Sequence, residues 1–373
     1  MVPRTDRYNR SNIAEGISMN SRTIFIAFFS FLMFWLLHGA VHAAVSLSSY
    51  PPDPSGHGLG FTRAYVDNVG RLLVFGAASG GPTNDNSIRV FDGRKWEYLW
   101  PNNYKNGGAQ VRHNHMSFYV PRLNEFWVWG GSHLETLPGA LRSGRFHVGT
   151  KTWLATSKTD AGAFEGVIKG GIPFLSTMSS AWSAQSDTGI IFGGSAEGGA
   201  TDWQWLIEPN STGPELYKIT QVSPTPRPHV RSQCMNCIVA VGSDFYLYAG
   251  TYQEPGGPYV NRKDLWRFDN RKRSWIQLPD APGTGYQPVL TYDSKANALV
   301  AWANDRIFVY EIAVQKWSDQ TPAGLPCVGN HVGGYLASIN THLYEGGNDC
   351  PGDNGRGPQL IGISLSNAAV LRH

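Results

Sequence analysis

Short apolar runs that end in small residues recur along the chain. They lie at residues 72–77, 126–131, 190–194, 245–250, 299–303 and 343–347, so the spacing is roughly 55 residues. Brief runs rich in Val, Ile, Leu, Phe, Tyr and Trp and bounded by glycine are typical of buried β-strands. The pattern therefore predicts six copies of one β-structured unit.

A second strand pattern with aromatic side chains follows each of the first five runs. Four units then show a lone tryptophan at a similar offset, namely Trp96, Trp153, Trp275 and Trp317. The third unit departs from this pattern, with Trp203 and Trp205 and no later tryptophan in register. The sixth unit lacks the tryptophan strand, so its missing strand must come from elsewhere.

The segment 45–50 is the candidate for that strand. It is followed by Pro51 and Pro52, just as the closing strand that begins at Trp275 is followed by Pro279. Pairing of this N-terminal strand in the last unit would remove two open sheet edges. Closure by the tail 367–373 is the alternative.

These residues resemble the kelch motif, in which four apolar residues precede a glycine pair and two spaced aromatic residues follow. The clearest copy runs from Asp264 through Trp275, and the resemblance covers nearly everything after residue 43. It implies an all-β fold, a six-bladed kelch-type β-propeller with four-stranded blades and a ring closed by the N-terminal strand. A glycine pair fits where blades converge, because a Cβ would clash there. A β-sandwich is the disfavoured alternative.

Composition supports this class and narrows the function. The chain has 373 residues with 43 glycines, 23 prolines and 13 tryptophans, which suit tight turns and the gaps between sheets and exclude a helical bundle. The net charge is only +3 and the basic residues are scattered. We therefore expect no nucleic-acid partner.

The N-terminus has the layout of a signal peptide. Residues 24–37 are uncharged and apolar, Arg22 precedes them, and the small residues Val41 and Ala43 follow. This run is short for a membrane-spanning helix, which needs about 20 residues, although an uncleaved anchor is the alternative. We predict a signal peptide at residues 1–43 and a single propeller domain at 44–373. The protein would be periplasmic or secreted, with no membrane contact after cleavage.

All four cysteines follow the predicted leader, at Cys234, Cys237, Cys327 and Cys350. In an exported protein, disulfides are the default expectation. We favour a bond between Cys327 and Cys350, because the repeat alignment places them at neighbouring loop ends; the pairing of the other two stays open. A redox pair or half of a zinc site at Cys234 and Cys237 is disfavoured, since no second ligand pair lies nearby.

Polar side chains gather where the predicted inner strands begin and in the loops after the glycine pairs. In a propeller these positions form one rim of the central channel, the default binding site. Arg63 is one of these leading residues. The predicted ligand-binding residues are Arg112, His113, His115, His133, Arg231, Gln233, Tyr286, Gln287, His331 and Asn348.

Arg112 and Arg231 are the strongest of these candidates, because a guanidinium can hold a carboxylate with two hydrogen bonds. The alternative for any one residue is that it satisfies carbonyl groups of neighbouring blades. We expect a monomeric, cofactor-free propeller that binds a polar ligand, either a carbohydrate or an extracellular protein.

An enzymatic alternative is a cofactor-free sugar mutarotase or epimerase. Length, export and blade number resemble the exported sialic acid mutarotase, a six-bladed kelch protein. No active-site residue can be matched position by position, and the catalytic residues are unknown. His113, His115 or His331 beside an arginine could serve as acid and base.

A metal site is a weaker alternative. His113 and His115 would point to the same side of a strand, and His331 or Tyr286 could complete a copper or zinc site. The kelch-type copper enzyme galactose oxidase uses an adjacent Tyr-His pair, and this chain contains no such dipeptide. Copper oxidase chemistry is therefore the least favoured function.

Overall fold

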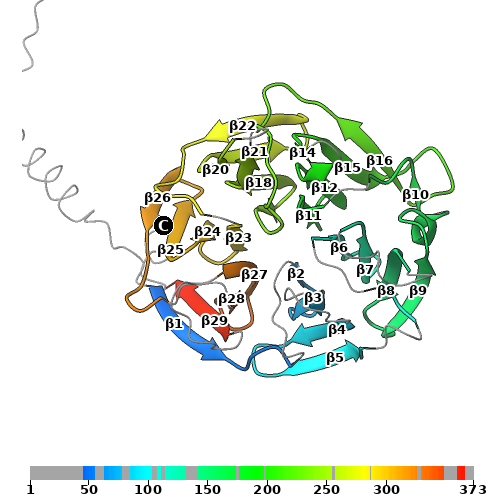
Figure 1. Cartoon of the computed structure of the whole chain (residues 1–373), viewed down its shortest axis with the longest axis horizontal. Helices are drawn as coiled ribbons and strands as arrows, with labels where there is room; N and C mark the ends of the chain where they lie inside the picture. Colours follow the sequence, from blue (N-terminus) through cyan, green and yellow to red (C-terminus); the bar gives the residue numbers. More distant parts are fainter. Residues whose placement is uncertain are drawn as a thin grey trace, which may run out of the picture. The chain divides into compact units, whose positions relative to one another are not determined.

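The structure, a computed structural model, is an all-β ring. It describes residues 45–54, 63–77, 85–102, 107–110, 114–131, 141–173, 176–196, 199–253, 257–285, 287–325, 329–347 and 359–365. Six antiparallel sheets stand around one axis and form a six-bladed β-propeller with four-stranded blades (Figure 1). The predicted fold class is confirmed.

The first three blades follow the chain from the innermost to the outermost strand. Blade I consists of β2 (Ala64–Val66), β3 (Leu72–Ala77), β4 (Asp85–Phe91) and β5 (Trp96–Trp100). Blade II consists of β6 (Met116–Val120), β7 (Glu125–Trp129), β8 (Ser143–His147) and β9 (Thr152–Ser157). Blade III consists of β11 (Ser179–Ser183), β12 (Thr188–Phe192), β15 (Gln204–Pro209) and β16 (Tyr217–Val222), with the short β10 (Ile168–Lys169) as a fifth strand outside β16.

The last three blades include the one that closes the ring. Blade IV consists of β17 (Ile238–Val241), β18 (Asp244–Tyr248), β21 (Leu265–Asp269) and β22 (Ser274–Leu278). Blade V consists of β23 (Val289–Asp293), β24 (Ala298–Ala303), β25 (Arg306–Glu311) and β26 (Lys316–Asp319). Blade VI consists of β27 (Gly329–Leu336), β28 (Thr341–Gly347), β29 (Gln359–Leu365) and β1 (Val45–Tyr50).

Strand β1 supplies the missing outer strand of blade VI, as the sequence predicted. It pairs antiparallel with β29 in a continuous register from Val45 opposite Leu365 to Tyr50 opposite Leu360. The beginning and the end of the propeller are thereby joined by backbone hydrogen bonds. Closure of this kind leaves no blade incomplete.

The hydrophobic core is divided into wedges between neighbouring blades. In the wedge between blades III and IV, Phe192 lies 5.4 Å from Trp275, ring centre to ring centre. The indole Nε1 of Trp275 donates a hydrogen bond of 2.8 Å to Oε1 of Gln204 across the same boundary. The tryptophans predicted from the repeat thus join adjacent blades, where their large rings fill the widening space.

The glycine pair after the second strand is explained by close backbone approach, to the next blade at Gly193 and within blade III at Gly194. Gly193 and Gly194 have φ angles of +71° and +95°. A Cβ on Gly193 would lie 2.6 Å from the carbonyl oxygen of Arg231, and a Cβ on Gly194 would lie 2.7 Å from the Cβ of Met178. Any other residue would be strained at either position, and at Gly193 it would also push the next blade away.

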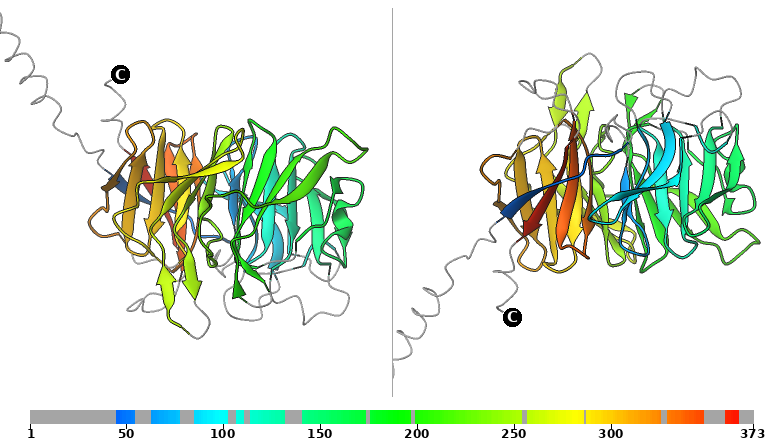
Figure 2. Two further views of the ribbon diagram at one scale, coloured as in Figure 1. Left: turned by 90° about the horizontal axis from the view of Figure 1, so that it is seen from above. Right: turned by 90° about the horizontal axis from the view of Figure 1, so that it is seen from below.

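The two faces of the ring differ. On one face the inner strands end in turns of two to five residues, at 67–71, 121–124, 184–187, 242–243, 294–297 and 337–340. We call it the short-turn face. The opposite, long-loop face carries the hairpins β13–β14 (Ser195–Ala196, Gly199–Ala200) and β19–β20 (Thr251–Gln253, Tyr259–Asn261), and the second of these projects well beyond the blades (Figure 2).

Deletion of residues 44–52 tests the closure. Loss of β1 removes the partly buried Val45 and Leu47 from the wedge between blades V and VI and exposes the edge of β29. We expect a loss of about 3 kcal/mol of unfolding free energy, seen as a fall in melting temperature. The control is deletion of residues 366–373. An unchanged melting temperature for the N-terminal deletion and a lowered one for the control would show closure by the tail.

Candidate functional site

A pocket of about 230 Å³ lies on the propeller axis. Inner strands or their leading residues from five blades line it: β2, β11, β17, β23 and β27. The wall combines hydroxyl and amide groups with aromatic rings, as in Tyr65, Ser180, Trp182, Asn236, Thr291 and Tyr335. A concave site with a few convergent polar groups on an otherwise apolar wall is typical of small-ligand binding.

The pocket is deepest beside Arg63 and widens toward the short-turn face. Along blade I, exposure rises from 2% at Arg63 to 36% at Val66, and both residues line the pocket. Strand β17 repeats this gradient, because Ile238 is buried whereas Val239 and Ala240 are half-buried. A ligand would therefore enter from the short-turn face and reach Arg63 last.

Arg63 spans the deep end of the pocket from blade I to blade III. Its Nη1 donates to the carbonyl oxygen of Ser180 at 2.9 Å and to the Ser180 hydroxyl at 2.7 Å, and its Nη2 donates to the carbonyl oxygen of Met178. Burial lowers the pKa of Arg63, and the neighbouring Tyr65 opposes this change. A guanidinium remains protonated under such conditions.

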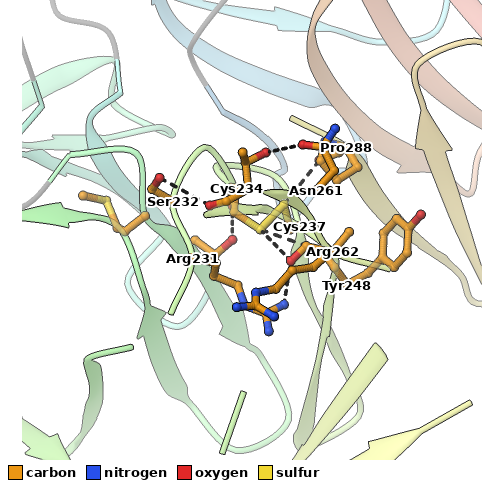
Figure 3. Close-up of a disulfide and its surroundings, with 12 residues drawn as sticks. Arg231, Ser232, Cys234, Cys237, Tyr248, Asn261, Arg262 and Pro288 are labelled. Atoms are coloured by element: carbon orange, nitrogen blue, oxygen red, sulfur yellow. Dashed lines mark hydrogen bonds between the residues drawn. A yellow bond between two sulfur atoms is a disulfide. The ribbon is translucent and has the colours of Figure 1, made fainter. Parts of the chain in front are cut away.

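One wall of the pocket is held by the disulfide between Cys234 and Cys237 (Figure 3). Met235 and Asn236, the two residues inside this short loop, line the pocket. The carbonyl oxygen of Asn236 accepts a hydrogen bond of 2.7 Å from the N–H of Leu290 in blade V. The disulfide therefore fixes a loop that both shapes the pocket and joins two blades. Cys327 and Cys350 lie outside the described residues.

Several predicted site residues also lie outside the described part of the chain. These are Arg112, His113, His133, Tyr286 and Asn348. His331 belongs to β27, where its backbone alone is described. The predicted clustering of these side chains, and the copper or zinc site that they could form, thus stay predictions.

Four predicted residues are described, and the pocket lining includes none of them. His115 is 1% exposed and packs edge-on against Phe75, with ring centres 5.5 Å apart. Nε2 of Gln287 donates a hydrogen bond of 2.8 Å to Oε1 of Gln233, so these two residues link the starts of blades IV and V. Both have φ angles of +50°, a conformation that is uncommon for residues other than glycine.

Arg231 is fully buried, and its contacts are within the propeller. It pairs with Asp264 at 2.8 Å and also donates to the carbonyl oxygens of Ala249 and His229. Burial alone would raise the pKa of Asp264, but the charge and hydrogen bond of Arg231, together with Trp266 and Arg262, outweigh burial and the pKa is lowered. These contacts tie the entry of β17 to the second and third strands of the same blade.

The sequence placed Arg63 in the ring of leading residues but not among the binding residues. Its signal is a charged residue directly before an apolar inner strand. Asn236 was not considered as a candidate, because the two cysteines that flank it suggested a structural or redox role for the segment instead.

In the described part of the chain, no group of three His, Cys, Asp or Glu side chains could hold a metal ion. No helix there is long and apolar enough to cross a membrane.

A buried polar cluster lies behind the pocket, between blades V and VI. Thr291 lines the pocket, and its hydroxyl lies 2.8 Å from Nδ1 of His342 and 2.8 Å from the hydroxyl of Tyr344. Nε2 of His342 lies 3.4 Å from Oδ2 of Asp293. Burial lowers the pKa of His342, although Asp293 opposes this. The imidazole is therefore held neutral in the folded protein.

No model of a known protein family matches this chain, and no curated protein matches it. The fold and the pocket therefore define its class. It is a closed six-bladed β-propeller with a pocket on its axis that polar and aromatic residues line.

We predict that the stability of the protein falls between pH 7 and pH 5 because of His342. Its pKa is depressed in the folded state, so below the ordinary value of about 6.5 the unfolded chain binds a proton that the folded chain does not. The loss reaches at most about 1.4 kcal/mol per pH unit. Urea unfolding at several pH values should show a shallower slope for His342→Gln, and an equal slope would contradict this assignment.

We predict that Arg231→Ala destabilises the fold by about 3–5 kcal/mol, because it leaves the largely buried Asp264 without its partner. Arg227→Ala is the matched control, since Arg227 pairs with Asp202 at 2.7 Å but both side chains are partly exposed. The control should lose less than about 1 kcal/mol. Equal losses in chemical denaturation would argue against a structural role for Arg231.

Proposed function

We propose that this protein is an exported, monomeric kelch-type propeller that binds a small polar ligand in its axial pocket. The observation that carries the proposal is the pocket itself, in which five blades contribute one buried charge, hydroxyl and amide groups, and aromatic rings. Aromatic rings suit the apolar faces of a sugar ring, while hydroxyls and amides suit its hydroxyl groups. A carbohydrate is therefore the preferred ligand.

The kelch assignment is supported by features of the blades. The glycine pair at Gly193 and Gly194, the tryptophans between blades, and the unit from Asp264 to Trp275 all occupy positions that the kelch motif would give them. Export is supported by the apolar run at residues 24–37 and by the disulfide between Cys234 and Cys237, since disulfides persist in oxidising compartments.

Binding is proposed in preference to mutarotation. The described lining offers the hydroxyls of Ser180, Thr291 and tyrosines, together with Arg63. At neutral pH these groups hold a ligand by hydrogen bonds but do not readily exchange protons with it. Anomer exchange of a bound sugar should therefore proceed at its uncatalysed rate.

Filling the pocket tests the proposal. Ala240 lies at the wide end and packs only in part against the wedge between blades III and IV, so Ala240→Trp should occupy the entrance, and a melting temperature equal to that of the wild type would show that the wedge is kept. Saturation-transfer NMR with a panel of mono- and disaccharides should identify a ligand for the wild type, and the variant should bind it at least about tenfold more weakly.

Val69→Trp is the matched control, because Val69 lies on the same face in the turn 67–71 and is 73% exposed. This variant should bind like the wild type. The choice of a carbohydrate fails if no saccharide binds the wild type, and the placement of the site in the axial pocket fails if both tryptophan variants bind equally well.

A further inference from the structure

Three arginine side chains among the described residues are buried, and only two of them have a carboxylate partner. Arg89 contacts Asp53 at 2.9 Å and Asp85 at 2.8 Å, and Arg231 contacts Asp264 at 2.8 Å. Arg63 is 2% exposed, yet its hydrogen-bond partners in the described chain are two backbone carbonyls and the hydroxyls of Ser180 and Tyr65, and none of them is a carboxylate. The two paired arginines show how this fold compensates a buried charge elsewhere.

A buried guanidinium without an anion is costly. Removing an ion from water costs several kcal/mol, and carbonyl dipoles offset only part of this. Charged residues are therefore rarely buried unless they are paired. Arg63 is the one charged side chain among the described residues that line the pocket, and it lies at the deep end of that pocket.

The unused donors of Arg63 lie on one edge of the guanidinium. Nη1 donates to two acceptors and Nη2 to one, whereas Nε has no partner in the described structure. A guanidinium has five N–H groups, so the Nε–H and one Nη2–H remain. The Nε–H shares the side edge of the fork with one of the two Nη2 hydrogens, and such an edge matches the two oxygens of a carboxylate.

The rest of the pocket favours an organic anion over a simple ion. Trp182, Tyr292 and Tyr335 line the pocket between Arg63 and the short-turn face, and Asn236 and Thr291 lie on the same wall. The rings of Trp182 and Tyr335 also pack against Phe118 and His342, respectively. Aromatic surface of this kind contributes binding energy by covering a carbon skeleton. A chloride ion would leave it uncovered.

We propose that Arg63 is a carboxylate-binding residue and that the ligand of the axial pocket is a small organic acid. Its carboxylate pairs with the side edge of the Arg63 guanidinium, and its body lies against the aromatic wall. This inference rests on the proposed binding function, whose ligand it defines more narrowly as acidic.

The test compares acetate with acetamide, which has nearly the same size and shape but no charge. The full-length mature protein is freed of organic acids and melted in 100 mM sodium acetate, or in 100 mM acetamide with 100 mM sodium chloride. We expect acetate to raise the melting temperature by about 2–4 °C over acetamide plus chloride. Equal melting temperatures overturn the proposal, because chloride would then serve Arg63 equally well.

Variants locate the effect. Arg63→Lys keeps a positive charge without the two-donor edge and should weaken acetate binding at least about fivefold, as measured by NMR line broadening of labelled acetate. Because Arg63 also joins blades I and III, this variant is paired with Ala240→Trp, which leaves Arg63 in place and should also abolish the acetate effect. Arg227→Gln, a change outside the pocket, should respond like the wild type. An undiminished response in Ala240→Trp overturns the assignment to the pocket.

The outcomes separate this inference from the function on which it rests. If neutral saccharides bind in the pocket and acetate has no effect, the carboxylate assignment fails and the binding function stands. If acetate acts through Arg63 and no saccharide binds, the choice of carbohydrate fails and the carboxylate site stands.

Discussion

The convergence of six inner strands on one axis is the constraint from which the rest of this structure follows. Strands packed around an axis have little room for side chains, so small residues such as Ser179, Ser180 and Gly333 occur there, and a Cβ on Gly333 would lie 2.9 Å from Val289 of the neighbouring inner strand. Away from the axis the blades diverge, and the space between them widens. Aromatic rings such as Trp275 fill this space. Because β1 completes blade VI, every wedge lies between two complete blades.

The same constraint concentrates polar groups where they can act together. Blades that are far apart in sequence bring Arg63, Ser180, Asn236 and Thr291 to one pocket. Elsewhere in the propeller, buried charge is matched within the fold, as in the pair of Arg231 and Asp264. The contrast between these two arginines separates a group that stabilises a blade from a group whose charge is directed toward a ligand.

The fold could be predicted from sequence because its determinants are local and repeated. The glycine pairs and the lone tryptophans each report on one blade or on its nearest neighbour. The sixth unit lacks one strand, and this gap identified β1 as the strand that closes the ring. The site could not be predicted in the same way. Arg231 pairs with the carboxylate of Asp264, 33 residues later in the sequence. Gln233 accepts a hydrogen bond from Gln287, whereas Arg63 donates hydrogen bonds to residues of blade III. Such choices depend on side-chain contacts between blades, and the spacing of residues along a strand does not reveal them.

A crystal structure of the mature protein, grown in a carboxylate buffer, tests most directly whether the charge of Arg63 serves a ligand. The account predicts a bound carboxylate with its oxygens about 2.8–3.0 Å from Nε and Nη2 of Arg63, and no Asp or Glu side chain of the protein within 4 Å of that guanidinium. A carboxylate of the chain itself paired with Arg63 would contradict it, because all three buried arginines would then have structural partners and the pocket would have no charge to offer.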